Sequence, residues 1–252
     1  MKRCATGILA VLLVAAPLTE NCLVAFPKDP GPEDVALWKV DAERGDADGQ
    51  YRVGMSYYHG QGVTRDYAEA MRWFRLSAAK GNGNAQCLIG YMYRKGLGVP
   101  RDYAEAMRWY RLSAENGNDY AQNLIGYMYH HGWGVTRDYA EAMKWYRRAI
   151  EKGNDGAEDN IGVLYELGQG VPCDYAEAMK WYRLAAAKGN EEAELNIGNL
   201  YHQGLGVTRD DAEAMKWYRL AAAKGNEEAR MNIRYMKEHD REGLSTTGRT
   251  GN

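Results

Sequence analysis

The chain has 252 residues, of which 45% are hydrophobic and 26% are charged, a balance that excludes an intrinsically disordered chain. Its 32 lysines and arginines against 34 aspartates and glutamates give a formal net charge of −2. Such a balance offers no general electrostatic attraction to nucleic acid or acidic lipid, so we expect no nucleic-acid partner.

Residues 1–25 have the features of a secretory signal peptide. A short cationic start precedes an apolar run that is too short to span a bilayer. We predict cleavage after Ala25, then a linker over residues 26–32, and export to the periplasm or out of the cell. Two alternatives remain open, namely lipid attachment at Cys22 and a buried N-terminal helix. After cleavage we expect no integral membrane segment.

From residue 33 to residue 239 the chain repeats every 36 residues. The segment that starts at Asp66 recurs with little change, and its copies start at Asp102, Asp138, Asp174 and Asp210. Asp followed by Glu three residues later is typical of a helix start, because each side chain caps an unpaired backbone donor. Each copy therefore predicts one helix, and a second helix that starts at a capping Asn follows it.

Two sets of residues recur inside these helices and predict a packed core. One is a mid-helix glycine, which costs about 1 kcal/mol relative to Ala and so indicates close contact between helices. Its copies are Gly90, Gly126, Gly162 and Gly198. The other is a tryptophan, which we expect in the repeat core, at Trp73, Trp109, Trp145, Trp181 and Trp217.

A single helix pair cannot bury two apolar faces, whereas stacked pairs can. We predict an all-α fold, a right-handed α/α solenoid of about six helix-turn-helix pairs over residues 33–239. The last pair looks like a polar cap because Arg234 replaces the mid-helix glycine. The segment 240–252, rich in Gly, Ser, Thr and Arg, is predicted to be a disordered tail.

The recurring residues resemble the Sel-one-like repeat, a close relative of the tetratricopeptide repeat. The resemblance rests on Ala68, Trp73, Phe74, Ala78, Gly81, Asn82, Ala85, Ile89, Gly90, Tyr93, Gly96, Gly98 and Val99. It covers roughly residues 40–239 and implies a scaffold or adaptor that assembles envelope complexes or acts in signalling and host-cell interaction. A cysteine-rich bacterial branch has been assigned penicillin-binding or β-lactamase activity, but this chain lacks the paired cysteines that the branch has in each repeat.

Trp133 is one candidate for contact with a partner, because it lies outside the repeat core and Trp is enriched at binding hot spots. His130 is another, although its equivalents change charge freely, which favours a solvated helix end over a metal site. A basic column offers a third surface for an acidic peptide, unless glutamates one turn away neutralise it. Its members are Arg72, Arg108, Lys144, Lys180 and Lys216.

For catalysis, Ser77 and Lys80 match the S-x-x-K motif of β-lactamases, but the companion S-D-N and K-T-G motifs are absent. We therefore predict no catalytic residue, no metal and no cofactor. The favoured function is an exported, monomeric adaptor that binds a protein or peptide. An enzyme that acts on β-lactams or peptidoglycan is the alternative, and a structural element that multimerises through its ends is a third.

Overall fold

The computed structural model describes residues 30–154 and 156–247, which contain twelve α-helices and no strand. The helices are α1 (Pro32–Glu43), α2 (Ala47–His59), α3 (Tyr67–Ala78), α4 (Gly83–Lys95), α5 (Tyr103–Glu115), α6 (Asp119–His131), α7 (Tyr139–Glu151), α8 (Ala157–Leu167), α9 (Tyr175–Ala187), α10 (Glu191–Gln203), α11 (Asp211–Ala223) and α12 (Glu227–Thr247). The predicted signal peptide (1–25) and most of the predicted linker (26–32) lie outside the described residues.

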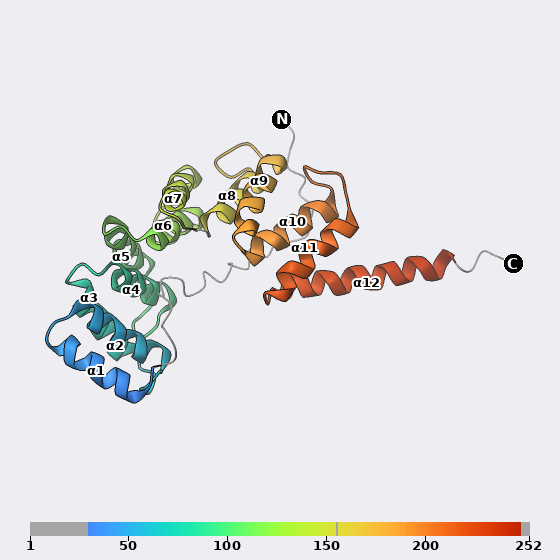
Figure 1. The fold of residues 1–252 in the computed structure, drawn as a ribbon. Helices are drawn as coiled ribbons and strands as arrows, with labels where there is room; N and C mark the ends of the chain where they lie inside the picture. The colour runs from blue at the N-terminus through green and yellow to red at the C-terminus, as the bar shows by residue number, and fades with distance from the viewer. Residues whose placement is uncertain (1–29, 155, 248–252) are drawn as a thin grey trace. The chain divides into compact units, whose positions relative to one another are not determined.

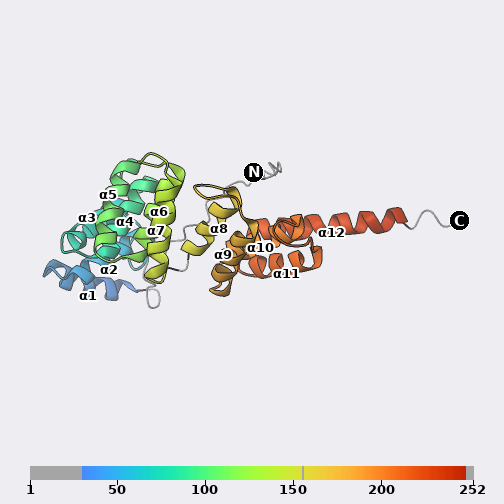
Figure 2. The ribbon, with the colours of Figure 1, turned by 90° about the horizontal axis from the view of Figure 1, so that it is seen from above.

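The helices form two compact units, one of α1–α7 and the other of α8–α12. Within each unit successive helices pack against one another, as Figures 1 and 2 show. Each unit is a stretch of an all-α repeat solenoid with repeats of about 36 residues, as the sequence predicts. None of the helices in the described ranges is long and apolar enough to cross a membrane.

The predicted capping residues start and end these helices. Asp66 Oδ1 accepts hydrogen bonds from the backbone N–H groups of Ala68 and Glu69, at 2.9 and 3.0 Å. Asn82 caps the next helix by accepting from the Ala85 N–H at 2.9 Å. That helix ends at Gly96, whose φ of +74° is a conformation that glycine adopts without strain. Local sequence thus sets the length of each helix.

Each mid-helix glycine receives an aromatic ring from the helix that follows it. A Cβ placed on Gly90 of α4 would lie 2.7 Å from Cδ1 of Tyr110 on α5, and the same contact joins Gly126 of α6 to Tyr146 of α7. Both tyrosines are fully buried. The predicted pairing, in which each Asp-capped helix belongs with the helix after it, is therefore shifted by one helix. The glycine–ring contact joins the two helices that the Gly-x-Gly-Val loop connects, because the glycine of the first helix faces the second helix.

Hydrogen bonds across 30 residues join neighbouring repeats. Ser113 Oγ donates to the Gly83 carbonyl at 2.7 Å. In the second unit the same separation is bridged by charge, because Lys188 Nζ lies 2.6 Å from Oε1 of the buried Glu158. These buried polar groups are therefore paired between repeats.

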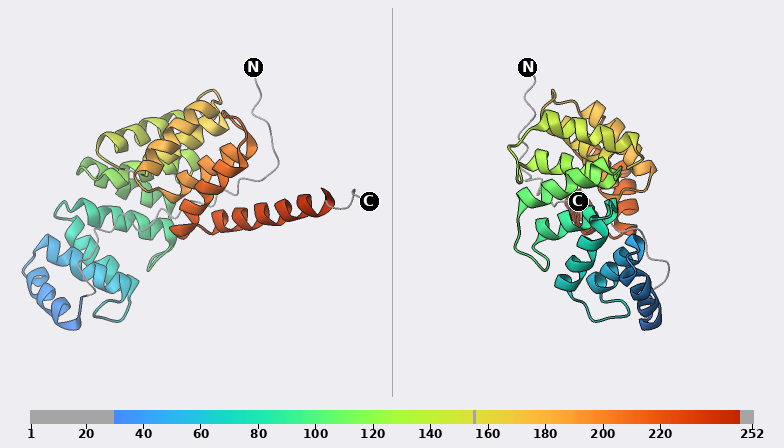
Figure 3. Two further views of the ribbon diagram at one scale, coloured as in Figure 1. Left: turned by 45° about the vertical axis from the view of Figure 1, so that its right-hand side comes forward. Right: turned by 90° about the vertical axis from the view of Figure 1, so that its left-hand side faces the viewer.

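The last helix is longer than the sequence predicts. Helix α12 continues to Thr247, past residue 239, where the array was expected to end and a disordered tail to begin. Figure 3 shows it as the longest helix of its unit. The reason is that Asp240 stands where Gly204 ends α10, so no left-handed glycine stops the helix.

Candidate partner-binding site

One position near the end of helices α2, α4, α6, α8 and α10 changes its chemistry from repeat to repeat. We call it the variable column, and its members are Tyr58, Arg94, His130, Glu166 and His202. The side chains of Arg94 and His130 are each only 5% exposed, so the predicted solvated helix end is wrong at these two positions. His130 follows Gly126 by one helical turn and therefore faces the same neighbouring helix.

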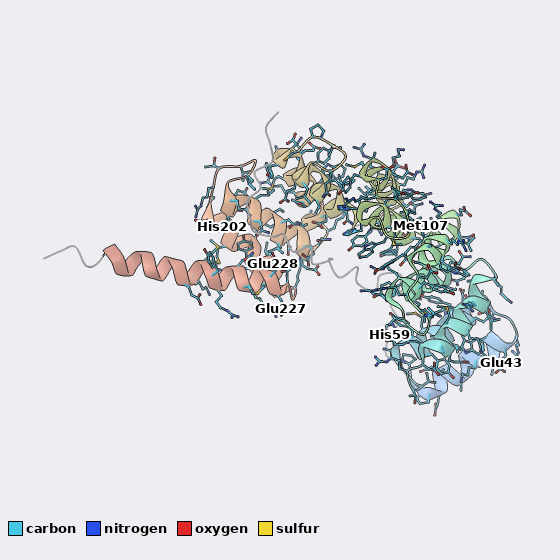
Figure 4. All side chains as sticks on the ribbon, turned by 180° about the vertical axis from the view of Figure 1, so that it is seen from behind. Glu43, His59, Met107, His202, Glu227 and Glu228 are labelled. Carbon is cyan, nitrogen blue, oxygen red and sulfur yellow. The ribbon has the colours of Figure 1, made fainter. Side chains whose placement is uncertain are left out.

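Members of the variable column meet the buried ring of the next helix. His130 Nδ1 lies 3.4 Å from the hydroxyl of Tyr146. The Tyr182 hydroxyl donates to Oε2 of Glu166 at 2.5 Å, and burial raises the pKa of the Glu166 carboxyl. On α10 of the second unit His202, labelled in Figure 4, instead lies 2.7 Å from Oδ1 of Asp211. The column thus makes a different polar contact at the same place in different repeats, buried at His130 and partly exposed at His202.

Around Arg94 the column forms a cluster of rings. Its guanidinium carbon lies 5.0 Å from the ring centroid of Tyr91 and 6.0 Å from that of Tyr127, within range of cation–π attraction. Tyr127 stacks on His131 with a centroid distance of 3.9 Å. Trp133 meets Tyr127 edge-on at 5.4 Å. We call these five residues the Arg94 cluster, and they come from α4, α6 and the loop after α6.

Trp133 is held in place by the preceding repeat. Its ring stacks on Tyr103, at the start of α5, with centroids 5.1 Å apart and planes 23° apart. The next residue, Gly134, lies so close to the Tyr103 carbonyl that a Cβ would clash with it. Trp133 is consequently half-buried, with one part of its ring in the cluster and another part exposed. Such a fixed amphipathic ring loses little entropy when a partner binds.

The electrostatics of the cluster are dominated by positive charge. No carboxylate of the described ranges lies within ion-pair distance of Arg94, and its Nε has no hydrogen-bond partner. Burial lowers the pKa of the His131 imidazole, and the nearby charges of Arg94 and Arg137 lower it further. His131 is therefore neutral at pH 7, and Arg94 supplies the fixed charge of the cluster.

The basic column forms the intrahelical pairs that the sequence offers as its neutral alternative. Lys144 Nζ lies 2.9 Å from Oε2 of Glu141, three residues earlier, and the Lys144 side chain is 66% exposed. Equivalent pairs are made by Arg72, Arg108, Lys180 and Lys216. These residues lie on the odd-numbered helices and do not join the Arg94 cluster, whereas Trp133 is a member of it and His130 contacts its His131.

The five repeated tryptophans are less deeply placed than predicted. Trp73 is buried, but Trp109, Trp145, Trp181 and Trp217 are only half-buried. The indole N–H of Trp109 donates to Oε1 of Glu105 at 3.0 Å, so its polar edge turns toward the surface. The deepest ring of each repeat is the next residue along, such as Tyr110. The tryptophans seal the edge of the core rather than fill its centre.

The S-x-x-K match does not form a catalytic pair in this structure. Ser77 is fully buried and its Oγ donates to the Ala47 carbonyl at 2.7 Å. Lys80 donates to the Gly45 carbonyl instead of approaching the serine. Both groups therefore tie α3 to the preceding repeat. Within the part of the chain that the structure describes, no three His, Cys, Asp or Glu side chains are grouped as metal ligands would be.

Arg94, Tyr91, Tyr127, His131 and Tyr103 are site residues that were not identified from the sequence. A signal for them exists, because the near-identical repeats keep most scaffold residues constant and differ at the variable column. Free change of charge suggests a solvated position. The alternative reading, a polar interior that differs between repeats, requires knowledge of which helix packs against the column.

The five helix pairs joined by glycine–ring contacts match a known repeat. The sequence profile of the Sel1 repeat matches residues 47–82, 83–118, 119–154, 156–190 and 191–226. Four of these matches start at the first residue of an even-numbered helix, namely α2, α4, α6 and α10. The fifth match, 156–190, starts one residue before α8. The family's repeat and the structural repeat are thus the same unit.

Solved structures of two bacterial repeat proteins are similar to this chain in sequence and in fold. A Sel1 repeat protein from Oxalobacter formigenes is 32% identical, with 80% of each chain covered and a TM-score of 0.74. A protective antigen of uropathogenic Escherichia coli with an SLR fold is 37% identical over 83% of this chain, with a TM-score of 0.71. This chain spans only 45% of that antigen's length.

An immunity protein from Pseudomonas aeruginosa shares the fold at 20% identity, with a TM-score of 0.54 over 83% of this chain and 81% of its own. No curated protein is significantly similar to the chain. The five matched repeats nevertheless cover more than half of the 252 residues, and the structure reproduces their boundaries. The chain therefore belongs to the Sel1 repeat family.

Proposed function

We propose that the protein is a non-catalytic scaffold or adaptor that binds a protein or peptide partner on the surface of its solenoid. The observation that carries this proposal is the Arg94 cluster, in which buried and half-buried rings surround a buried cation within a constant framework. Sel1 repeats typically mediate protein interactions. Arg and aromatic side chains also dominate binding energy at protein interfaces.

Trp133 is the residue of this surface that we assign to partner contact. It combines an exposed edge with a fixed orientation, and its equivalents Gln61, Leu97, Gln169 and Leu205 are all non-aromatic. His130, by contrast, is buried and shapes the surface from beneath. We do not assign the basic column to this surface, because each of its members already pairs with a glutamate.

Affinity capture from an envelope extract tests the proposal. The bait is the tagged chain, and a true partner is stoichiometric and is competed away by untagged protein. Trp133→Ala should lose that partner while its helical circular dichroism stays unchanged. Arg108→Ala is the matched control, because Arg108 lies on an exposed, paired position outside the cluster. Equal retention of the partner by both variants would exclude the Arg94 cluster as the binding surface.

We further propose that the protein is exported, with residues 1–25 as its signal peptide. Support comes from the cationic start and short apolar run, and from the similarity to an E. coli protein described as a protective antigen. Mass spectrometry of the protein recovered from periplasmic and culture-medium fractions should find an N-terminus at Phe26. A cytoplasmic protein that retains Met1 would contradict this proposal.

A further inference from the structure

We propose that Arg94 is an anion-binding residue that takes a side-chain carboxylate from an acidic segment of the partner. This inference rests on the proposed scaffold function and adds to it the chemistry of the bound segment. It names Arg94 as the specificity-determining residue, with the rings of the Arg94 cluster as its walls.

The positive charge of Arg94 is buried without a carboxylate partner in residues 30–154. A guanidinium that leaves water must recover its lost hydration from hydrogen bonds and a counter-ion, and proteins almost always supply both. Arg94 is 5% exposed, its Nε is unsatisfied, and no Asp or Glu of residues 30–154 is close enough to pair with it. The rings of Tyr91 and Tyr127 and the nearby hydroxyl of Tyr110 recover part of that cost, but none of them carries a negative charge. A carboxylate from outside would complete the site.

The two segments of chain that surround Arg94 carry basic residues and no acidic ones. Residues 81–101, which contain α4 and the loop after it, include Arg94, Lys95 and Arg101 but no Asp or Glu. Residues 120–137, which contain most of α6 and its loop, also lack Asp and Glu and include Arg137. The second unit differs, because α8 carries Glu166 at the position of Arg94 and α10 carries three glutamates in its first turn. The surface around Arg94 is therefore complementary to a negatively charged segment.

Further cations lie beside the rings of the Arg94 cluster. Lys95 follows Arg94 on the exposed side of α4, and the guanidinium of Arg101 lies 5.5 Å from the ring of Tyr103. Tyr103 in turn stacks on Trp133. Cations thus flank the rings on the exposed side, while Arg94 lies beneath them. Arg binds a carboxylate through two parallel hydrogen bonds, which makes the site selective for a planar anion.

Pairs of synthetic peptides test the inference on the full chain. The probe is an array of acetylated, amidated octapeptides in which each member with a central Glu has a partner with Gln. Fluorescence anisotropy then measures affinity for labelled members that bind. We expect the Glu peptides to bind about tenfold or more tightly than their Gln partners, since a charge-assisted pair replaces a neutral one.

Arg94→Gln should reduce this preference to within about twofold, while Arg94→Lys keeps part of it because the charge remains. Arg108→Gln is the matched control and should keep the full preference, because Arg108 is exposed and already paired. Circular dichroism establishes that each variant is folded. The inference is overturned if no pair shows a Glu preference, if the preference survives Arg94→Gln, or if Arg108→Gln removes it equally.

Two further arms separate the inference from competing accounts. Tighter binding of a single-stranded oligonucleotide, lost in Arg94→Gln, would replace the acidic peptide by a nucleic acid. A captured protein partner that Arg94→Gln retains at full affinity would leave the scaffold function standing and remove the role of Arg94. Glu-selective peptide binding without any captured partner would do the reverse.

Discussion

The ring of Tyr146 lies directly against Gly126, where a Cβ would come within 2.6 Å of the ring's Cδ1 atom. The tyrosine is fully buried and cannot move aside without opening the core between α6 and α7. This contact recurs in every matched repeat, from Gly54 with Phe74 to Gly198 with Tyr218. It explains why a helix-weakening residue is kept in the middle of a helix.

Gly126→Ala should therefore destabilise the protein although alanine is the better helix former. We expect a loss of about 1–3 kcal/mol in the free energy of unfolding, because the added methyl group overpacks the core. Urea unfolding followed by circular dichroism measures the change. Gly83→Ala is the matched control, because a Cβ there meets nothing closer than 3.6 Å. A stabilising effect of Gly126→Ala would show that the contact is not tight.

Stability should fall as pH rises because of Asp159 on α8. Burial raises the pKa of this carboxyl to about 7, and a hydrogen bond from Asn196 only partly opposes the shift. The folded state therefore holds the proton up to a higher pH than the unfolded state does. Stability is fully present below about pH 4 and is lost as pH rises through about 7, by up to about 4 kcal/mol.

Urea unfolding at pH 5 and pH 8 checks this dependence, with Asp159→Asn as the matched variant. Asparagine keeps the shape and stays neutral, so the variant should be more stable than the wild type at pH 8 and close to it at pH 5. Parallel pH profiles for the two proteins would show that Asp159 does not titrate in this range.

The contributions of Lys188 and Glu158 to the free energy of unfolding should be coupled, because each charge compensates the other. Lys188→Met leaves the 3%-exposed Glu158 carboxylate uncompensated, and we expect a loss of about 1–3 kcal/mol in unfolding free energy. The loss is limited because the Lys188 side chain is itself 40% exposed. Adding Glu158→Gln should restore most of it, since Gln50, Gln86 and Gln122 occupy the same position in other repeats. Additive losses in a double-mutant cycle would contradict this coupling.

Arg94→Met should raise the melting temperature or leave it unchanged. The substitution removes a buried cation that has no carboxylate partner in residues 30–154, and it keeps most of the side-chain volume. A purely structural arginine would instead cause a loss when removed. Differential scanning calorimetry distinguishes the two roles, with the exposed Arg108→Met expected to change stability by no more than about 0.5 kcal/mol.

The sequence predicts the framework of this protein well because each helix carries its own boundary signals. The Asp66 and Asn82 caps and the left-handed Gly96 act within a few residues of chain, so their effect can be derived locally. The mid-helix Gly126 likewise indicates a close approach, because only a tertiary contact compensates its cost. The sequence does not determine which helix packs on this glycine, since the helix before it and the helix after it both fit the repeat pattern.

The site could not be predicted in the same way. His130 and Arg94 are polar and variable, which is what an exposed position looks like in a single sequence. Their burial follows from the helix across the Gly-x-Gly-Val loop, which covers the side chain that follows the mid-helix glycine by one turn. The length of α12 follows a simpler rule. The Gly and Ser content of the tail predicts disorder, but no helix-ending glycine stands at residue 240 and the helix continues to Thr247.

The most direct test of the central claim is capture of a partner by the wild type, Trp133→Ala and Arg108→Ala in parallel, with the amount of bound partner quantified by mass spectrometry. The account predicts a stoichiometric partner with the wild type and Arg108→Ala, and its loss with folded Trp133→Ala. Full capture by Trp133→Ala, or no competed partner with the wild type at bait concentrations above the micromolar range typical of transient complexes, would contradict it.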